Sequence, residues 1–258
     1  MSYWIDRLAD AQDAISKKNQ KQIEKRLKRY YASVMKQIIA DFEATYDRLL
    51  ATVEEGKEAT PADLYKLDKY WQLQAQTRAR LQKLGEKQVV ALSKAFETNF
   101  FEVYYGLEIE GMEAFTTLDK AAVKQVVNQI WVADGKNFSQ RVWDNVERLR
   151  ETLEEGLIHT VATGKKTTEL KEILQERFGV SYRRADTLVR TELTHIQTQA
   201  AQKRYEDYGI QYVEVLVDPD ARTCDKCKAL IGKRFPITAA PPLPVHPNER
   251  CCVVPIIE

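Results

Sequence analysis

The spacing of apolar and polar positions predicts helices over most of the chain. Positions 3 to about 55 contain neither Pro nor Gly. Their apolar residues recur three or four positions apart, which is the spacing of one helix face. A single helix of this length would extend on the order of 75 Å, and a break into two helices remains an alternative. Its apolar stripe includes Ile38, Ile39, Phe42, Tyr46, Leu49 and Leu50.

A second long helix is expected after the turn at Gly56. Thr60 suits the N-cap, Pro61 the first helical turn and Asp63 the helix N-terminus. The helix would run to about Tyr105, with Gly85 as a weak point. Two long helices joined by a short loop predict an antiparallel hairpin over residues 1–111. The stripe of the second helix comprises Leu64, Leu67, Tyr70, Trp71, Leu81, Leu84, Val89, Leu92 and Phe96.

The remainder, residues 112–258, is predicted to be an α+β module. Helix-capping residues divide residues 119–209 into several helices, with Asp119, Ser139, Thr168 and Ser181 as the expected N-caps and a break at Phe178–Gly179. After Gly209 the short alternating segment 211–217 is typical of a strand, and a turn follows at Asp218–Asp220. Residues 251–257 are again strand-like. The expected fold is therefore mainly α, with a small β cap at 210–258.

Charge and hydropathy bear on whether the protein binds nucleic acid, enters a membrane or is secreted. The formal net charge is +1, which indicates no global attraction to nucleic acid or membrane. The opening residues lack the apolar region of a secretory signal, and no apolar run approaches the ~18 residues that span a bilayer. One local basic excess stands out, for which the alternatives are a solvated helix face or contact with an acidic surface or DNA phosphates. It includes Lys17, Lys18, Lys21, Lys25, Arg26, Lys28 and Arg29.

All four cysteines lie between residues 224 and 252. Cys224 and Cys227 form a C-x-x-C turn, the usual source of two ligands in a tetrahedral zinc site. His246 and a following cysteine would complete the set, and only Cys251 or Cys252 can face the metal because neighbours in a strand point to opposite faces. Such a zinc ion would be structural, since four protein ligands leave no position for water. The alternatives are buried apolar cysteines, disulfides, or a redox pair.

These residues also carry a family resemblance. They are Phe178-Gly-Val-Ser181, Ala185, Arg190-Thr-Glu192, Ala200, Tyr205, Gly209, the run from Asp220 to Phe235 and the closing His246-Pro-Asn-Glu-Arg-Cys251. Together they resemble the phage Mu F-like family, the head morphogenesis or minor head proteins of tailed bacteriophages and prophages, over roughly residues 135–258. The family's closing motif has a cysteine where this chain has Glu249. Cys251 matches the second cysteine of that motif, so it is preferred over Cys252 as the fourth zinc ligand.

The resemblance implies a minor component of the virion, made in the host bacterial cytoplasm. Such a protein would associate with portal, capsid or scaffolding proteins during procapsid assembly, and could influence DNA packaging or ejection. The resemblance does not specify an oligomeric state.

Within the Arg-Thr-Glu motif, Arg190 and Glu192 point about 200° apart on an ideal helix, so they cannot pair with each other. Each is expected instead to tie the last helix to the cap, as a structural clamp. Catalysis is the disfavoured alternative. An ADP-ribosyltransferase would need a Ser-Thr-Ser strand that this chain lacks, and a His-Asn-His nuclease would need a helix after the final histidine. The chain is therefore predicted not to be an enzyme.

Overall fold

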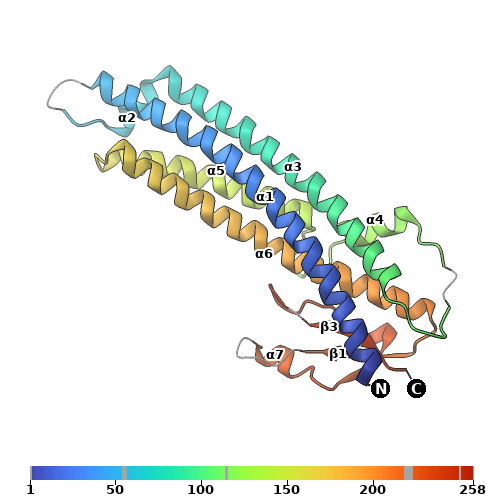
Figure 1. Ribbon diagram of the computed structural model, residues 1–258. Helices are drawn as coiled ribbons and strands as arrows, with labels where there is room; N and C mark the ends of the chain where they lie inside the picture. The colour runs from blue at the N-terminus through green and yellow to red at the C-terminus, as the bar shows by residue number, and fades with distance from the viewer. Residues whose placement is uncertain (1, 54–56, 114–115, 218–222, 250, 258) are drawn as a thin grey trace. The chain divides into compact units, whose positions relative to one another are not determined.

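The computed structural model describes residues 2–53, 57–113, 116–217, 223–249 and 251–257, so Gly56 and the Asp218–Asp220 turn lie outside the described residues. The fold is mostly helical with one small antiparallel sheet, which confirms the predicted fold class (Figure 1). None of the described helices combines the length and apolar character needed to cross a bilayer. The elements are α1 (Ser2–Thr52), α2 (Pro61–Lys66), α3 (Asp68–Gly106), α4 (Lys120–Asn128), α5 (Phe138–Ala162), α6 (Thr167–Asp207), β1 (Tyr212–Leu216), α7 (Asp225–Lys228), β2 (Arg234–Pro236), a 3-10 turn (Ile237–Ala239) and β3 (Cys252–Pro255).

Two of the expected helix starts are confirmed in detail. Thr60 and Asp63 form a capping box, in which the Thr60 hydroxyl accepts from the Asp63 amide at 3.3 Å and the Asp63 carboxylate accepts from the Thr60 amide at 3.2 Å. The Asp119 carboxylate caps α4 by accepting from the Ala121 amide at 3.0 Å. The helix after Thr60 ends early, because Leu67 adopts an extended conformation that separates α2 from α3.

The expected break at Gly179 and Ser181 is wrong. α6 runs through both positions as one helix. Ser181 is buried, and its carbonyl accepts a hydrogen bond from Asn145 Nδ2 at 2.9 Å while its hydroxyl lies 3.2 Å from that of Tyr31. These partners satisfy the polar groups that would otherwise favour a cap. The cost of a helical glycine, about 1 kcal/mol, is offset by burial of Leu174 and Phe178 on the same helix.

The chain forms two compact units that are discontinuous in sequence. The first comprises residues 1–24, 91–138 and 186–258, and the second residues 25–90 and 139–185. Both are discontinuous because α1, α3 and α6 each pass from one unit into the other. The division of the chain into a helical hairpin over residues 1–111 and a C-terminal module over residues 112–258 stays a prediction.

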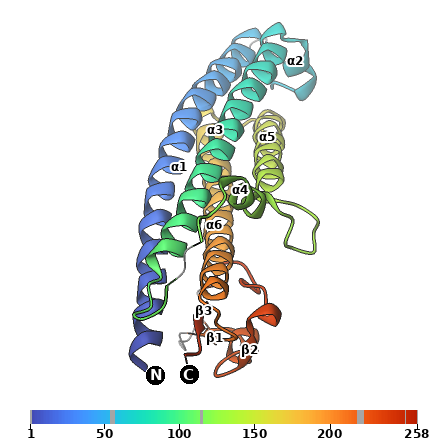
Figure 2. The same cartoon turned by 90° about the vertical axis from the view of Figure 1, so that its right-hand side faces the viewer.

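The second unit is a bundle in which segments of α1, α3, α5 and α6 lie side by side (Figures 1 and 2). Its core follows the predicted stripes with four exceptions, since Leu50 is 44% exposed, Trp71 is 61% exposed, and Leu67 and Val89 are only half-buried. Gly85 does not weaken α3, because a Cβ there would lie within 3.0 Å of ring carbons of Trp143 on α5. The core includes Leu27, Ile38, Phe42, Tyr46, Leu49, Leu64, Tyr70, Leu81, Leu84, Leu153, Leu157, Leu174 and Phe178.

In the first unit, the sheet has the strand order β2-β1-β3, with β1 antiparallel to both neighbours. Val213 of β1 pairs with Phe235 on one side and Pro255 on the other. The sheet is held to two helices by polar groups, since Gln12 Nε2 of α1 donates to the Val253 carbonyl at 2.9 Å and to the Tyr205 hydroxyl of α6 at 3.2 Å. The sheet therefore shares its core with α1 and α6.

Candidate metal centre in the C-terminal cap

The C-x-x-C segment forms one short helical turn. Cys224 is the N-cap of α7, and its sulfur accepts from the Cys227 amide at 3.5 Å. This turn brings the two Sγ atoms to 3.6 Å from each other. Tetrahedral zinc with bonds of about 2.3 Å would place two sulfurs about 3.8 Å apart, and a disulfide would require about 2.05 Å. All four cysteines are free, and the spacing is compatible with a ligand pair or with hydrogen-bonded thiols.

His246 approaches this pair from the loop before β3. Its Nε2 lies 3.2 Å from Cys227 Sγ, and its Nδ1 lies 2.9 Å from the Pro247 carbonyl. Because Nδ1 has a carbonyl acceptor, it carries the proton, and Nε2 then offers a lone pair toward the sulfur. Donor atoms of Cys224, Cys227 and His246 all lie within 4.8 Å of one another. Three of the predicted ligands therefore converge.

Cys251 belongs to a second, overlapping group. Donor atoms of Cys227, Glu249 and Cys251 also lie within 4.8 Å of one another, and all three residues are buried. Cys252 is absent from both groups among the described residues. Burial raises the pKa of the Cys252 thiol to about 12, and the Asp13 carboxylate of α1 adds to the effect, so this cysteine faces the helices. The side chains of the two adjacent cysteines thus face in different directions.

A tight turn formed by residues 245–249 positions His246. Glu249 Oε2 accepts hydrogen bonds from the backbone amides of Val245 and His246, the latter at 3.3 Å. Asn248 occupies the left-handed region with φ 60°, which asparagine tolerates better than most residues. The Glu249 side chain therefore acts within the turn as a cap for two backbone donors.

α6 holds this turn through residues that the sequence analysis did not single out. The Thr191 hydroxyl accepts from the Asn248 amide at 3.4 Å, and the Thr194 hydroxyl shares its proton between the Arg190 carbonyl of its own helix at 3.1 Å and the Glu249 carbonyl at 3.2 Å. His195 Nδ1 lies 3.3 Å from the Leu243 carbonyl. Positions 191, 194 and 195 share one helix face, and this i, i+3, i+4 spacing was the only signal available in the sequence.

His195 is a buried, neutral histidine. Its ring stacks on Trp131 at 4.1 Å between centroids, and Gln129 Nε2 donates to its Nε2 at 3.1 Å. Burial lowers the pKa of His195 to about 4, against the opposing effect of the Leu243 carbonyl. The residue is therefore a structural link between α6 and two segments of the first unit.

The pKa values of the two thiols in the C-x-x-C turn are shifted in opposite directions. Hydrogen bonds, first from the Cys227 amide, lower the pKa of Cys224. Burial, followed by the Cys224 interaction, raises the pKa of Cys227 to about 11. A catalytic cysteine paired with histidine needs a depressed pKa. The Cys227–His246 pair therefore lacks the activation of a nucleophilic dyad.

Arg190 and Glu192 have separate surroundings on α6. Arg190 forms ion pairs with Asp186 of the same helix at 2.8 Å and with Glu24 of α1 at 3.4 Å. Glu192 is buried, and its Oε2 accepts from Trp131 Nε1 at 3.0 Å. These contacts link α6 to α1 and to the segment after α4, whereas Thr191, Thr194 and His195 make the contacts with the cap given above. The clamp between Arg190, Glu192 and the cap stays a prediction.

The basic residues of α1 differ in their partners. Lys17 pairs with Asp13 at 2.6 Å, and Lys18 pairs with Glu102 of α3 at 2.7 Å. The side chains of Lys21, Lys25, Lys28 and Arg29 are exposed, and Arg26 is half-buried. The exposed four follow one helix face by their spacing of four, three and one residues.

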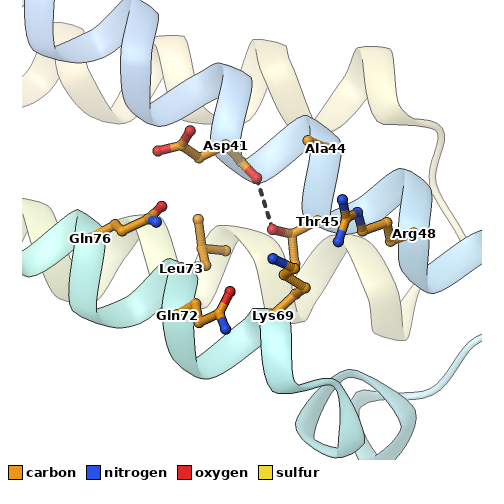
Figure 3. Close-up of a pocket in the computed structure, with 8 residues that line it drawn as sticks. All are labelled: Asp41, Ala44, Thr45, Arg48, Lys69, Gln72, Leu73 and Gln76. Atoms are coloured by element: carbon orange, nitrogen blue, oxygen red, sulfur yellow. Dashed lines mark hydrogen bonds between the residues drawn. The ribbon is translucent and has the colours of Figure 1, made fainter.

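Two open cavities lie away from the cysteine cluster. One, of about 140 Å³, is formed in the second unit by α1 and α3 (Figure 3), where the Thr45 hydroxyl donates to the Asp41 carbonyl at 2.8 Å. The other, of about 510 Å³, is formed in the first unit by residues including Arg7, Glu108 and Arg204. Neither cavity contains Arg190, Glu192 or a cysteine. Neither therefore has the residues expected of an active site built on the predicted candidates.

Comparison with known proteins gives one match. Residues 151–254 match the family model described as Phage Mu protein F like protein. No curated protein and no solved structure matches the chain significantly. The matched segment begins within α5, includes all of α6 and extends through the cysteine cluster into β3. The resemblance expected from the motifs is thereby confirmed over residues 151–254, which match the model of the phage Mu protein F like family.

Proposed function

We propose that the protein is a minor structural component of a tailed-phage head that acts in head morphogenesis. The family match over residues 151–254 is the observation that carries this proposal. In this role the chain would reside in the virion, bind the portal or the inner capsid during procapsid assembly, and influence DNA packaging or ejection. The long helices support such a role because they offer extended surfaces for other head proteins.

The cap would be stapled by a zinc ion with a structural role. Cys224, Cys227 and His246 converge at distances close to those of a tetrahedral site. The fourth ligand would come from the second group of donor residues, of which the sequence analysis favours Cys251. A closed site of four protein ligands leaves no position for substrate, which agrees with a non-enzymatic protein.

Quantitative proteomics of purified procapsids and mature virions tests the head-protein proposal. We expect the chain in at least one of these particles at a fixed copy number relative to the portal. Its absence from both would refute the proposal. Cross-linking mass spectrometry on the same particles would identify the neighbouring head protein.

A second candidate is non-specific DNA binding by α1. The exposure of Lys21, Lys25, Lys28 and Arg29 on one helix face favours it. Binding to phosphates through a few cations would weaken steeply with salt and depend little on base sequence. Changing these four residues to Glu should abolish binding, with the paired residues Lys17 and Lys18 changed to Glu as the control. Unchanged binding in the four-residue variant would exclude this face.

A further inference from the structure

Glu249 is a buried carboxylate with an unused oxygen beside the cysteines. The residue is 5% exposed. Its Oε2 is engaged by the amides of Val245 and His246, whereas its Oε1 is buried without a hydrogen-bond partner among the described residues. No lysine or arginine of the described residues forms an ion pair with it. Burial of an ionised carboxylate is costly unless a cation or donors compensate it.

This carboxylate lies beside one of the predicted metal ligands. A Glu249 oxygen lies within 4.8 Å of Cys227 Sγ and Cys251 Sγ, and Cys227 is also a member of the Cys224–His246 group. The two groups therefore meet at Cys227. A metal ion bound to Cys224, Cys227 and His246 would share the Cys227 sulfur with the group that contains Glu249.

We infer that Glu249 is the fourth protein ligand of the metal, giving a site with two sulfurs, one nitrogen and one oxygen. This inference rests on the proposed zinc staple. Zn²⁺ accepts carboxylate oxygen at about 2.0–2.2 Å beside thiolate and imidazole ligands. The cation would compensate the buried charge, and Oε2 would keep its two amide donors. Cys251 would then fill space as a small buried side chain.

The same carboxylate links metal binding to the shape of the loop. Oε2 fixes the backbone that presents His246, and the carbonyl of Glu249 accepts from Thr194 of α6. One residue would thus connect the metal, the histidine turn and the last long helix. A ligand that is itself hydrogen-bonded is held in its binding orientation.

X-ray absorption spectroscopy of the zinc-loaded full-length protein tests the ligand set directly. We expect two sulfur and two nitrogen or oxygen ligands. Three sulfurs with one nitrogen would assign the fourth position to Cys251 and overturn the inference while leaving the zinc staple intact. Failure to bind zinc stoichiometrically would overturn both.

A matched pair of variants separates Glu249 from a water ligand. Glu249→Gln keeps an acceptor for the two amides but removes the charge, and Cys251→Ser removes the neighbouring sulfur. With Co²⁺ as the probe, we expect Glu249→Gln to shift the ligand-field bands and weaken affinity by at least about tenfold. Cys251→Ser should leave the sulfur-to-cobalt charge-transfer intensity unchanged. The inference fails if the Gln variant leaves the cobalt spectrum unaltered, or if the Ser variant loses about a third of the charge-transfer intensity.

Discussion

The helical bundle of the second unit and the C-terminal cap bury their interiors by different means. In the bundle, long helices bury rings and leucines such as Phe42, Tyr70 and Leu153, which their own spacing places on one face. The cap has strands of five, three and four residues. It completes its interior with polar anchors from Gln12, Thr191 and Thr194 and with a cluster of cysteines.

This contrast indicates where each region is vulnerable. A small sheet cannot bury enough apolar surface to fold alone, so side-chain hydrogen bonds and the proposed metal would contribute a large share of its stability. The bundle depends instead on packing density along its stripes. Perturbations of metal and polar anchors should therefore affect the cap, and perturbations of volume should affect the bundle.

Removal of the proposed metal is expected to give the largest difference in stability between the cap and the bundle. Chelation of the proposed zinc should unfold the cap, because structural zinc sites contribute about 10 kcal/mol or more to folding of small domains. Hydrogen exchange should accelerate in residues 212–216 and 252–255, while circular dichroism at the helix minimum changes little. Cys227→Ser should reproduce the effect and Cys252→Ser should not. Equal loss of helical signal and cap protection would contradict the contrast.

A cavity in the bundle should give the opposite result. Phe42 is 1% exposed, so Phe42→Ala is expected to destabilise the second unit by about 3–5 kcal/mol. Urea unfolding followed by circular dichroism measures this loss. Metal affinity should stay within about threefold of the unmodified protein. A large loss of metal binding would show that the cap depends on the bundle core.

Acid should weaken the contacts of His195 before it affects the bundle. The folded pKa is lowered to about 4, below the ordinary value of 6.5, so the unfolded chain binds a proton more readily. The contribution of neutral His195 to the free energy of unfolding is complete above pH 6.5. It decreases as pH falls toward 4, by at most about 3 kcal/mol. Urea unfolding at pH 5 and pH 7 should show a smaller difference for His195→Gln than for the unmodified protein. Equal differences would show that His195 does not titrate in this way.

The smallest effect is expected from a single polar anchor. Thr194→Val keeps the side-chain shape but removes the donor to the Glu249 carbonyl, which should cost about 0.5–1.5 kcal/mol in cap stability. Thr98→Val is the matched control, because the Thr98 hydroxyl donates to the Lys94 carbonyl of its own helix. Hydrogen exchange in β3 provides the measurement. Identical exchange in both variants would remove Thr194 as an anchor.

Local sequence signals predicted the features that depend on neighbours in the chain. The Thr60–Asp63 capping box and the Asp119 cap need only residues within one turn, and both occur as expected. The convergence of Cys227 and His246 was also suggested by ligand spacing, although their distance could only come from the structure. Such signals succeed because the partners are close in sequence or restricted to rare residue types.

The misses depend on partners that are distant in sequence. Ser181 resembles a cap, but Tyr31 and Asn145 hold it inside α6. β2 has three residues and ends in Pro236, so only its pairing with β1 identifies it as a strand. Glu249 is one of many acidic residues, and nothing in its local sequence shows that it is buried. No periodicity encodes these long-range contacts.

The close contact between Gly85 of α3 and the Trp143 ring of α5 has a consequence for the axial register of the bundle. Two helices with apolar stripes can in principle slide past each other by one turn, about 5.4 Å, and still bury similar surfaces. The Trp143 ring fits against α3 only where a Cβ is missing. A slip of one turn would set the ring opposite Leu81 or Val89, each of which carries a Cβ and a larger side chain. Gly85 therefore restricts α3 and α5 to a single axial alignment.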